Sequence, residues 1–147
     1  MAEIHHRLVI RAPIERVYEA LTTVEGLRRW WTTDVNGAPD EAGAIVQFRF
    51  GTMGPDMRVE RLTRPTRVEW LCVNHARQAE EWIGTRFAFA LSEANGAVVV
   101  RFQQSGWREA SDFLAHCSTK WATFLLSLRE SVETGAGRPF PYDLQIA

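Results

Sequence analysis

The feature that most constrains the fold is a set of apolar residues near the C-terminus that recurs with the period of an α-helix. Ser111 suits the N-cap and Gly135 the C-terminal stop of this helix, which spans about six turns. Its apolar stripe comprises Phe113, Cys117, Trp121, Phe124, Leu128 and Val132, with Leu114 and Leu125 along one edge. A stripe this long has to be buried, so the rest of the chain must supply a large apolar surface.

Six segments with the alternation typical of β-strands supply that surface. They comprise residues 5–11, 44–50, 57–62, 67–74, 82–91 and 97–104. The connectors 51–55, 64–66 and 93–96 are short and rich in turn-forming residues, which predicts that consecutive strands pair antiparallel. Residues 36–40 are also rich in turn formers and are expected to form a loop.

Two short helices are expected between the first and second strands. Pro13 suits the first turn of a helix over residues 14–21. Thr22 and Glu25 have the spacing of a capping box at the start of a second helix. One face of that second helix carries Val24, Leu27 and Trp31. The predicted order is therefore βααβββββα, an α+β fold in which the long helix lies across a six-stranded antiparallel sheet.

Length and charge narrow the class of protein. The 147 residues fit a single domain, of which residues 138–147 are expected to be an extended tail. The net charge is −1 with both signs interspersed, which argues against a nucleic-acid or membrane-surface partner. No apolar run approaches the roughly 18 residues of a membrane span, and residues 1–7 lack a signal core, so a cytoplasmic location is expected. The two cysteines, Cys72 and Cys117, lie in apolar patterns typical of reduced core thiols.

Several segments resemble one known superfamily in order and spacing. Residues 21–32, which read LTTVEGLRRWWT, are similar to a signature of the START-like (SRPBCC) superfamily, in the branch of the heat-shock-protein-90 ATPase activator homologues. Matching pieces follow at residues 43–50, 64–70, 116–128 and 135–141. The resemblance implies a helix-grip fold, in which a curved sheet wraps round the C-terminal helix and often leaves a cavity. Relatives often carry glycine where this chain has bulkier residues at 117–120, which would narrow such a cavity.

A cavity of this kind would be lined by side chains on the inward faces of the strands and the long helix. The candidate ligand-binding residues are Trp30, Met57, Val59, Trp70, Cys72, Phe87, Phe89, Val100, Phe102, Gln104, Trp121 and Leu125. The alternative is that these side chains simply fill the core, since packed interiors contain few voids. Of the adjacent tryptophans, only one is expected to face the core; Trp31 fits the helix stripe, which makes Trp30 the candidate gate.

Polar residues offer fewer candidates. Asn74, His75, Arg86 and Gln104 lie near strand ends, where a cavity mouth is expected, although alternation sends Arg86 outward.

For the remaining side chains that could act in catalysis or metal binding, the sequence favours a structural role. Asp112 and His116 are one helical turn apart and form either a solvated pair or a general-base pair. Cys117 lies in the apolar stripe, where a thiol stays protonated and serves packing. His5 and His6 point to opposite faces of a strand, so no metal site is expected.

Three functions remain open at this stage. The first is binding of a small apolar or aromatic molecule without a cofactor, driven by burial of apolar surface. The second is an enzyme of the cyclase or aromatase kind, which the resemblance allows and for which the sequence offers no clear acid or base. The third is a chaperone-associated interaction module. A monomer or a weak homodimer is expected. Ala115, Ala122 and Leu126 form a small apolar strip on the far side of the long helix, which is either a weak dimer contact or scattered surface, and the second interpretation is favoured.

Overall fold

The computed structural model describes residues 2–76 and 80–147, which form an α+β fold. Seven strands make one antiparallel sheet in the order β1-β7-β6-β5-β4-β3-β2. The strands are β1 (Ala2–Ile10), β2 (Asp34–Gly37), β3 (Ile45–Arg49), β4 (Gly54–Thr63), β5 (Arg67–Ala76), β6 (Arg86–Ala94) and β7 (Ala97–Trp107). The helices are α1 (Ile14–Thr22), α2 (Val24–Trp30) and α3 (Asp112–Thr134), with a short 3-10 helix η1 (Glu80–Trp82) before β6.

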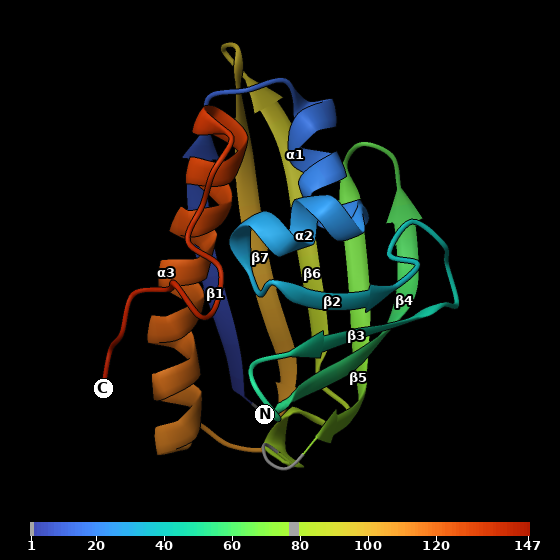
Figure 1. Cartoon of the computed structure of the whole chain (residues 1–147), viewed down its shortest axis with the longest axis vertical. Coiled ribbons are helices and arrows are strands. Elements are labelled where there is room, and N and C mark those ends of the chain that lie inside the picture. The colour runs from blue at the N-terminus through green and yellow to red at the C-terminus, as the bar shows by residue number, and fades with distance from the viewer. Residues whose placement is uncertain (1, 77–79) are drawn as a thin grey trace.

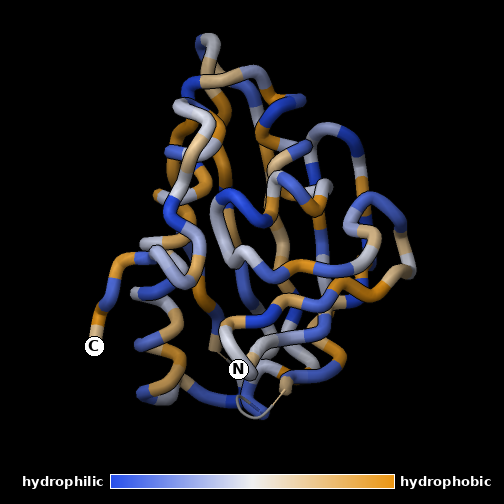
Figure 2. The backbone as a smooth tube through the Cα atoms, viewed as in Figure 1, coloured by the Kyte–Doolittle hydropathy of each residue, from blue (hydrophilic) through white to orange (hydrophobic). Residues whose placement is uncertain are grey.

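The curved sheet and the long helix α3 give the helix-grip arrangement that the sequence predicted (Figure 1). Helix α3 packs against β1, while α1 contacts β5, β6 and β7. Apolar and polar residues alternate along the strands (Figure 2), so one face of the sheet can meet the helices while the other remains in water. In the described part of the chain, no helix combines the length and apolarity needed to cross a membrane.

The ends of α3 confirm the predicted caps. The Ser111 hydroxyl accepts a hydrogen bond from the backbone N–H of Leu114 at 3.1 Å. Gly135 ends the helix with φ of 94°, a left-handed conformation that costs glycine little. The boundaries of α3 are local consequences of these two residues, which is why the sequence was sufficient to predict them.

The prediction of six strands is wrong, because the sheet has a seventh strand, β2, whose last two residues fall in the expected loop 36–40. Its residues Asp34–Gly37 pair antiparallel with β3, with Asn36 opposite Gln47. The strand has only four residues, and Val35 is its single buried side chain. Pairing with β3 therefore defines this strand, and its sequence carries too little alternation to show it.

Two further boundaries differ from the prediction. The segment 82–91 does not begin as a strand, since Trp82 ends η1 and the Thr85 N–H and hydroxyl both donate to the Trp82 carbonyl. The predicted capping box is displaced by one residue. Thr23, with an extended backbone, accepts from the Gly26 N–H at 3.0 Å, whereas the Thr22 hydroxyl donates to the Tyr18 carbonyl within α1. Pro13 is the N-cap of α1 and lies just outside its first turn.

The C-terminal tail is held against the body of the protein. Phe140 donates its N–H to the Trp31 carbonyl at 2.9 Å and accepts from the Thr33 N–H at 3.1 Å. The Ser127 hydroxyl of α3 accepts from the Arg138 N–H at 2.7 Å and donates to the Trp30 carbonyl at 2.8 Å. The tail therefore turns back along α3, as Figure 1 shows, and becomes a fixed part of the surface.

Candidate ligand pocket

The predicted ligand-binding residues come together as a closed interior. All twelve, which are Trp30, Met57, Val59, Trp70, Cys72, Phe87, Phe89, Val100, Phe102, Gln104, Trp121 and Leu125, are at most 2% exposed. Their rings lie in contact, with centroid distances of 4.3 Å between Phe102 and Trp121 and 5.1 Å between Trp70 and Phe89. Contact at these distances is that of a packed core. Of the twelve, Trp121 alone also lines the pocket described below.

The prediction that only one of the two adjacent tryptophans faces the core is wrong. Trp30 and Trp31 are 0% and 2% exposed, and their rings stack 5.9 Å apart. Trp31 is the C-cap of α2, and its N–H still donates to the Leu27 carbonyl. Its ring is buried against Phe48, Trp70 and Trp121. Trp30 donates its indole N–H to the Ala20 carbonyl at 2.9 Å, and it is Trp31 that lines the pocket.

A pocket of about 360 Å³ opens at the mouth of this interior. The N-terminal half of α3 contributes Phe113, His116, Cys117, Lys120, Trp121 and Phe124. The β3–β4 turn contributes Phe50, Met53, Gly54 and Pro55. Trp31, His75 and Trp82 form a further wall, and the tail closes it with Phe140, Asp143 and residues 145–147. The volume lies at the small end of the range of about 300–1,000 Å³ found for ligand sites.

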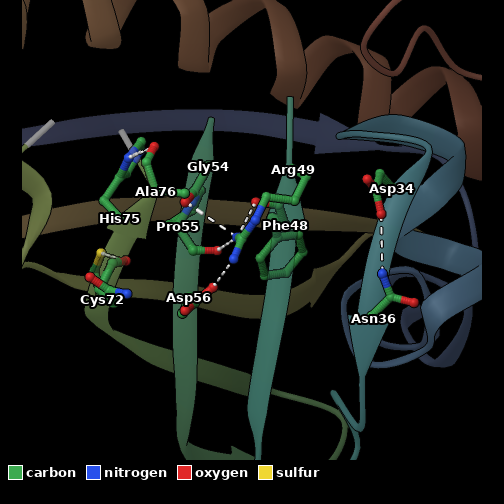
Figure 3. Close-up of polar contacts among 11 residues, drawn as sticks. Asp34, Asn36, Phe48, Arg49, Gly54, Pro55, Asp56, Cys72, His75 and Ala76 are labelled. Atoms are coloured by element: carbon green, nitrogen blue, oxygen red, sulfur yellow. Dashed lines mark hydrogen bonds and ion pairs between the residues drawn. The ribbon is translucent and has the colours of Figure 1, made fainter. Parts of the chain in front are cut away.

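Arg49 fixes the wall made by the β3–β4 turn (Figure 3). Its guanidinium donates to the carbonyls of Phe48, Gly54 and Pro55 at 3.0–3.3 Å and to the Asp56 carboxylate at 2.8 Å. Gly54 has φ of 148°, and a Cβ there would lie 1.9 Å from the Phe48 carbonyl oxygen. Only glycine therefore allows the two strands to approach this closely.

An ion pair fixes the wall made by the tail. The Lys120 ammonium of α3 binds the Asp143 carboxylate, whose side chain is 3% exposed, and donates to the Leu144 carbonyl at 2.6 Å. The same ammonium lies 5.1 Å from the centre of the Phe124 ring. Lys120 is the only lysine or arginine among the pocket-lining residues described, and its charge is compensated by Asp143.

Burial favours the neutral forms of His75 and Cys117 in the pocket wall and of Cys72 in the core. Burial lowers the pKa of His75, partly offset by its contact with the Ala76 carbonyl, so the imidazole is neutral at pH 7. Burial raises the pKa of Cys117 to about 11, and that of Cys72 in the core to about 12. Thiols with such pKa values are protonated at neutral pH and are poor nucleophiles.

The polar residues predicted near the mouth separate into three groups. His75 lines the pocket, with its ring 5.6 Å from that of Trp82. Gln104 is fully buried and donates to the Thr85 hydroxyl at 3.1 Å. Asn74 and Arg86 are exposed, and Arg86 forms an ion pair with Glu60 at 3.2 Å.

The other candidates for chemistry are not assembled into a site. His116 lines the pocket and stacks on Phe113, and no hydrogen bond joins it to Asp112 within the described residues. His5 contacts Glu3, while His6 contacts the Ser118 carbonyl of α3. Across residues 2–76 and 80–147 there is no cluster of three or more His, Cys, Asp or Glu side chains suited to a metal ion.

Sequence reasoning missed the pocket wall that comes from turns and tail. Met53 and Phe140 lie outside the regular alternation of the strands and the stripe of α3, so periodicity does not identify them. Phe50 continues the alternation of Val46 and Phe48 at the end of the predicted strand 44–50, but it was not among the predicted ligand-binding residues. Apolar residues in connectors, such as Met53 and the 139–142 segment, were the signal that could have done so.

A curved antiparallel sheet wrapped round a C-terminal helix, with an apolar pocket at its open end, defines the helix-grip class of proteins. The model of the family described as Activator of Hsp90 ATPase homolog 1-like protein matches residues 11–133, and the chain belongs to this family.

Solved structures share the fold, and one of them is also similar in sequence. The Aha1 dimer from Colwellia psychrerythraea is 44% identical with a TM-score of 0.83, covering 93% of this chain and 100% of that one. SSP2350 from Staphylococcus saprophyticus is 17% identical with a TM-score of 0.76 over 94% and 97% of the two chains. CalU16 from Micromonospora echinospora is 19% identical with a TM-score of 0.70 over 88% and 73%. No curated protein matches the chain.

Proposed function

We propose that this protein binds a small apolar or aromatic molecule in the pocket between α3, the β3–β4 turn and the tail. The observation that carries the proposal is the aromatic lining of the pocket, in which Trp31, Trp82 and Trp121 meet Phe50, Phe113 and Phe124. Aromatic rings provide much apolar contact area with little side-chain entropy to lose. The interior predicted from the sequence is filled by its own side chains, so the proposed site lies at its mouth.

The expected affinity is moderate. A two-ring aromatic molecule that buries about 250 Å² of apolar surface gains about 6 kcal/mol from leaving water. The cost of association offsets part of this gain, so we expect dissociation constants from micromolar to submillimolar. A ligand that also forms hydrogen bonds in the pocket would bind more tightly.

A neutral fluorescent probe tests the proposal. We expect N-phenyl-1-naphthylamine to become bright on binding, and the variant Phe113→Ser to weaken its binding about tenfold, since the lost ring removes about 60 Å² of contact. The matched control is Leu62→Ser, which removes a half-buried apolar side chain outside the pocket and should leave probe affinity unchanged. Equal affinity in all three proteins, or no binding to the wild type, would refute the proposal.

A second candidate is an enzyme that moves a proton within the same pocket. The observation in its favour is His75, a half-buried and neutral imidazole in the wall that could act as a general base. The two candidates differ in their dependence on this residue. His75→Gln should leave ligand binding nearly unchanged, whereas it would abolish turnover of a substrate that requires the base.

We also propose that the chain forms a homodimer, since the 44% identical Colwellia psychrerythraea structure is that of a dimer. Leu126 on the outer side of α3 is 49% exposed and is the largest residue of the apolar strip that it forms with Ala115 and Ala122. Light scattering over a range of concentrations should show a dimer that Leu126→Glu dissociates. Ile83→Glu, at a 45% exposed position on another face, is the control. A wild type that stays monomeric, or equal masses for both variants, would refute this proposal.

A further inference from the structure

Three pocket-lining residues, Trp82, Trp121 and Asp143, carry a buried polar atom without a nitrogen or oxygen partner among the described residues, and two of these atoms have no other contact to engage them. One is the indole N–H of Trp121, whose ring is 2% exposed, and the other is Oδ1 of Asp143. Both residues line the pocket, one from α3 and the other from the tail. Buried polar atoms are nearly always paired in folded proteins, so an unpaired donor and an unpaired acceptor in one pocket indicate that a bound molecule supplies the partners.

Other unpaired atoms provide the comparison. The indole N–H groups of Trp70 and Trp107 are also buried without a partner, but neither residue lines the pocket. The Trp82 indole does line the pocket and lacks a nitrogen or oxygen partner, but it is engaged by the Cys117 sulfur. Burial raises the pKa of that thiol, and the hydrogen bond from Trp82 partly offsets this effect. Trp121 and Asp143 are therefore the two positions from which a ligand can be recognised.

The charges of the pocket exclude an anionic ligand. Lys120 is the only lysine or arginine in the described wall, and Asp143 already binds its ammonium group. The Leu144 carbonyl accepts a second hydrogen bond from that ammonium group. A ligand carboxylate would have no free cation to bind and would lie in the same pocket as the Asp143 carboxylate, which repels it.

We infer that the ligand is a neutral aromatic molecule that carries a hydroxyl group, an inference that rests on the proposed function. A hydroxyl group can accept a hydrogen bond, which the Trp121 indole N–H offers, or donate one, which Oδ1 of Asp143 can accept. A hydrocarbon would leave both atoms unpaired, and an acid would introduce an unpaired negative charge. The pocket thus selects a phenol or an aromatic alcohol of small size.

Three probes with the same ring system test this inference by calorimetry at pH 7: naphthalene, 2-naphthol and 2-naphthoate. We expect 2-naphthol to bind about fivefold more tightly than naphthalene, the factor given by one ordinary hydrogen bond, and 2-naphthoate to bind weakest. Trp121→Phe keeps an aromatic ring and removes the N–H, so it should reduce the preference for naphthol over naphthalene. Trp107→Phe, the control, removes an equally unpaired N–H outside the pocket and should leave this preference unchanged.

Asp143→Asn gives a second, independent readout. It removes the charge that compensates Lys120, so 2-naphthoate should bind more tightly to this variant than to the wild type. The inference is overturned if naphthol and naphthalene bind the wild type equally, if Trp107→Phe changes the preference as much as Trp121→Phe, or if Asp143→Asn does not improve naphthoate binding. Failure of all three probes to bind would instead refute the proposed function.

Discussion

Replacing Ser127 with alanine should detach the tail and thereby weaken one wall of the pocket. The Ser127 hydroxyl joins three parts of the chain, since it lies on α3, donates to the Trp30 carbonyl at 2.8 Å and accepts from the Arg138 N–H at 2.7 Å. The side chain is buried, so water does not replace it easily. Gly137 also packs here, where a Cβ would lie 2.6 Å from the Ser127 carbonyl oxygen.

The expected cost follows from these two hydrogen bonds. Each contributes about 1 kcal/mol net, and leaving a buried carbonyl or N–H unpaired adds a further penalty. We therefore expect Ser127→Ala to lower the free energy of unfolding by about 2–3 kcal/mol. For a domain of this size that corresponds to a decrease in Tm of roughly 5–10 °C.

Ser131→Ala is the matched control, one helical turn further along α3. Its hydroxyl is also buried but donates only to the Leu128 carbonyl of the same helix at 2.8 Å. Alanine favours helix, so we expect a change within about 0.5 kcal/mol. The assay is urea denaturation, with hydrogen exchange at the Arg138 and Phe140 amides as the local readout. Equal stabilities of the two variants, or unchanged exchange in Ser127→Ala, would refute the role of Ser127.

Three other predictions follow from the pocket wall and its titratable groups. Gly54→Ala should lower the free energy of unfolding by more than about 3 kcal/mol, because its Cβ would meet a carbonyl oxygen at 1.9 Å. Gly51→Ala, also at positive φ but with open space around it, should lower it by about 1–2 kcal/mol. Equal denaturation midpoints for the two variants would contradict this prediction. Because the pKa of Cys117 is raised to about 11, a thiol reagent at pH 8 should label the native protein slowly and the unfolded protein rapidly; rapid native labelling would exclude the buried thiol. Burial keeps the pKa of His75 below the 6.5 of a free imidazole, so the unfolded chain binds the proton more tightly and the free energy of unfolding should fall as the pH drops through 6.5. Urea titrations at pH 7.5 and 5.5 should show a smaller loss of stability in His75→Gln than in the wild type. An equal loss in the two proteins would contradict the assignment.

The sequence alone predicts the elements whose ends and buried faces depend on local residues. Helix α3 has an apolar stripe and local caps at Ser111 and Gly135, so its length and buried face could be predicted. The β4–β5 and β6–β7 hairpins alternate regularly, and a short turn joins the two strands of each. Strand β2 has four residues and one buried side chain, and only its pairing with β3 makes it a strand.

The candidate site could be predicted only in part, because alternation shows which side chains face inward and not whether space remains between them. Trp70, Phe87 and Phe89 face inward as expected, yet their rings fill the interior. The pocket depends on where the tail returns to the helix, which tertiary contacts such as that between Lys120 and Asp143 determine. A pair 23 positions apart in the sequence, with ordinary residue types, gives no local pattern that indicates the contact.

The measurement that tests the central claim most directly is a filtered NMR experiment that detects nuclear Overhauser effects between 2-naphthol and the protein. A ligand at the mouth should show contacts to Met53, Phe113 and Ile146, which line the pocket. It should show none to the methyl groups of Met57, Val59 and Val100, which are at most 1% exposed in the interior. Contacts to these interior methyl groups would contradict the account, because they would mean that the core opens to admit the ligand.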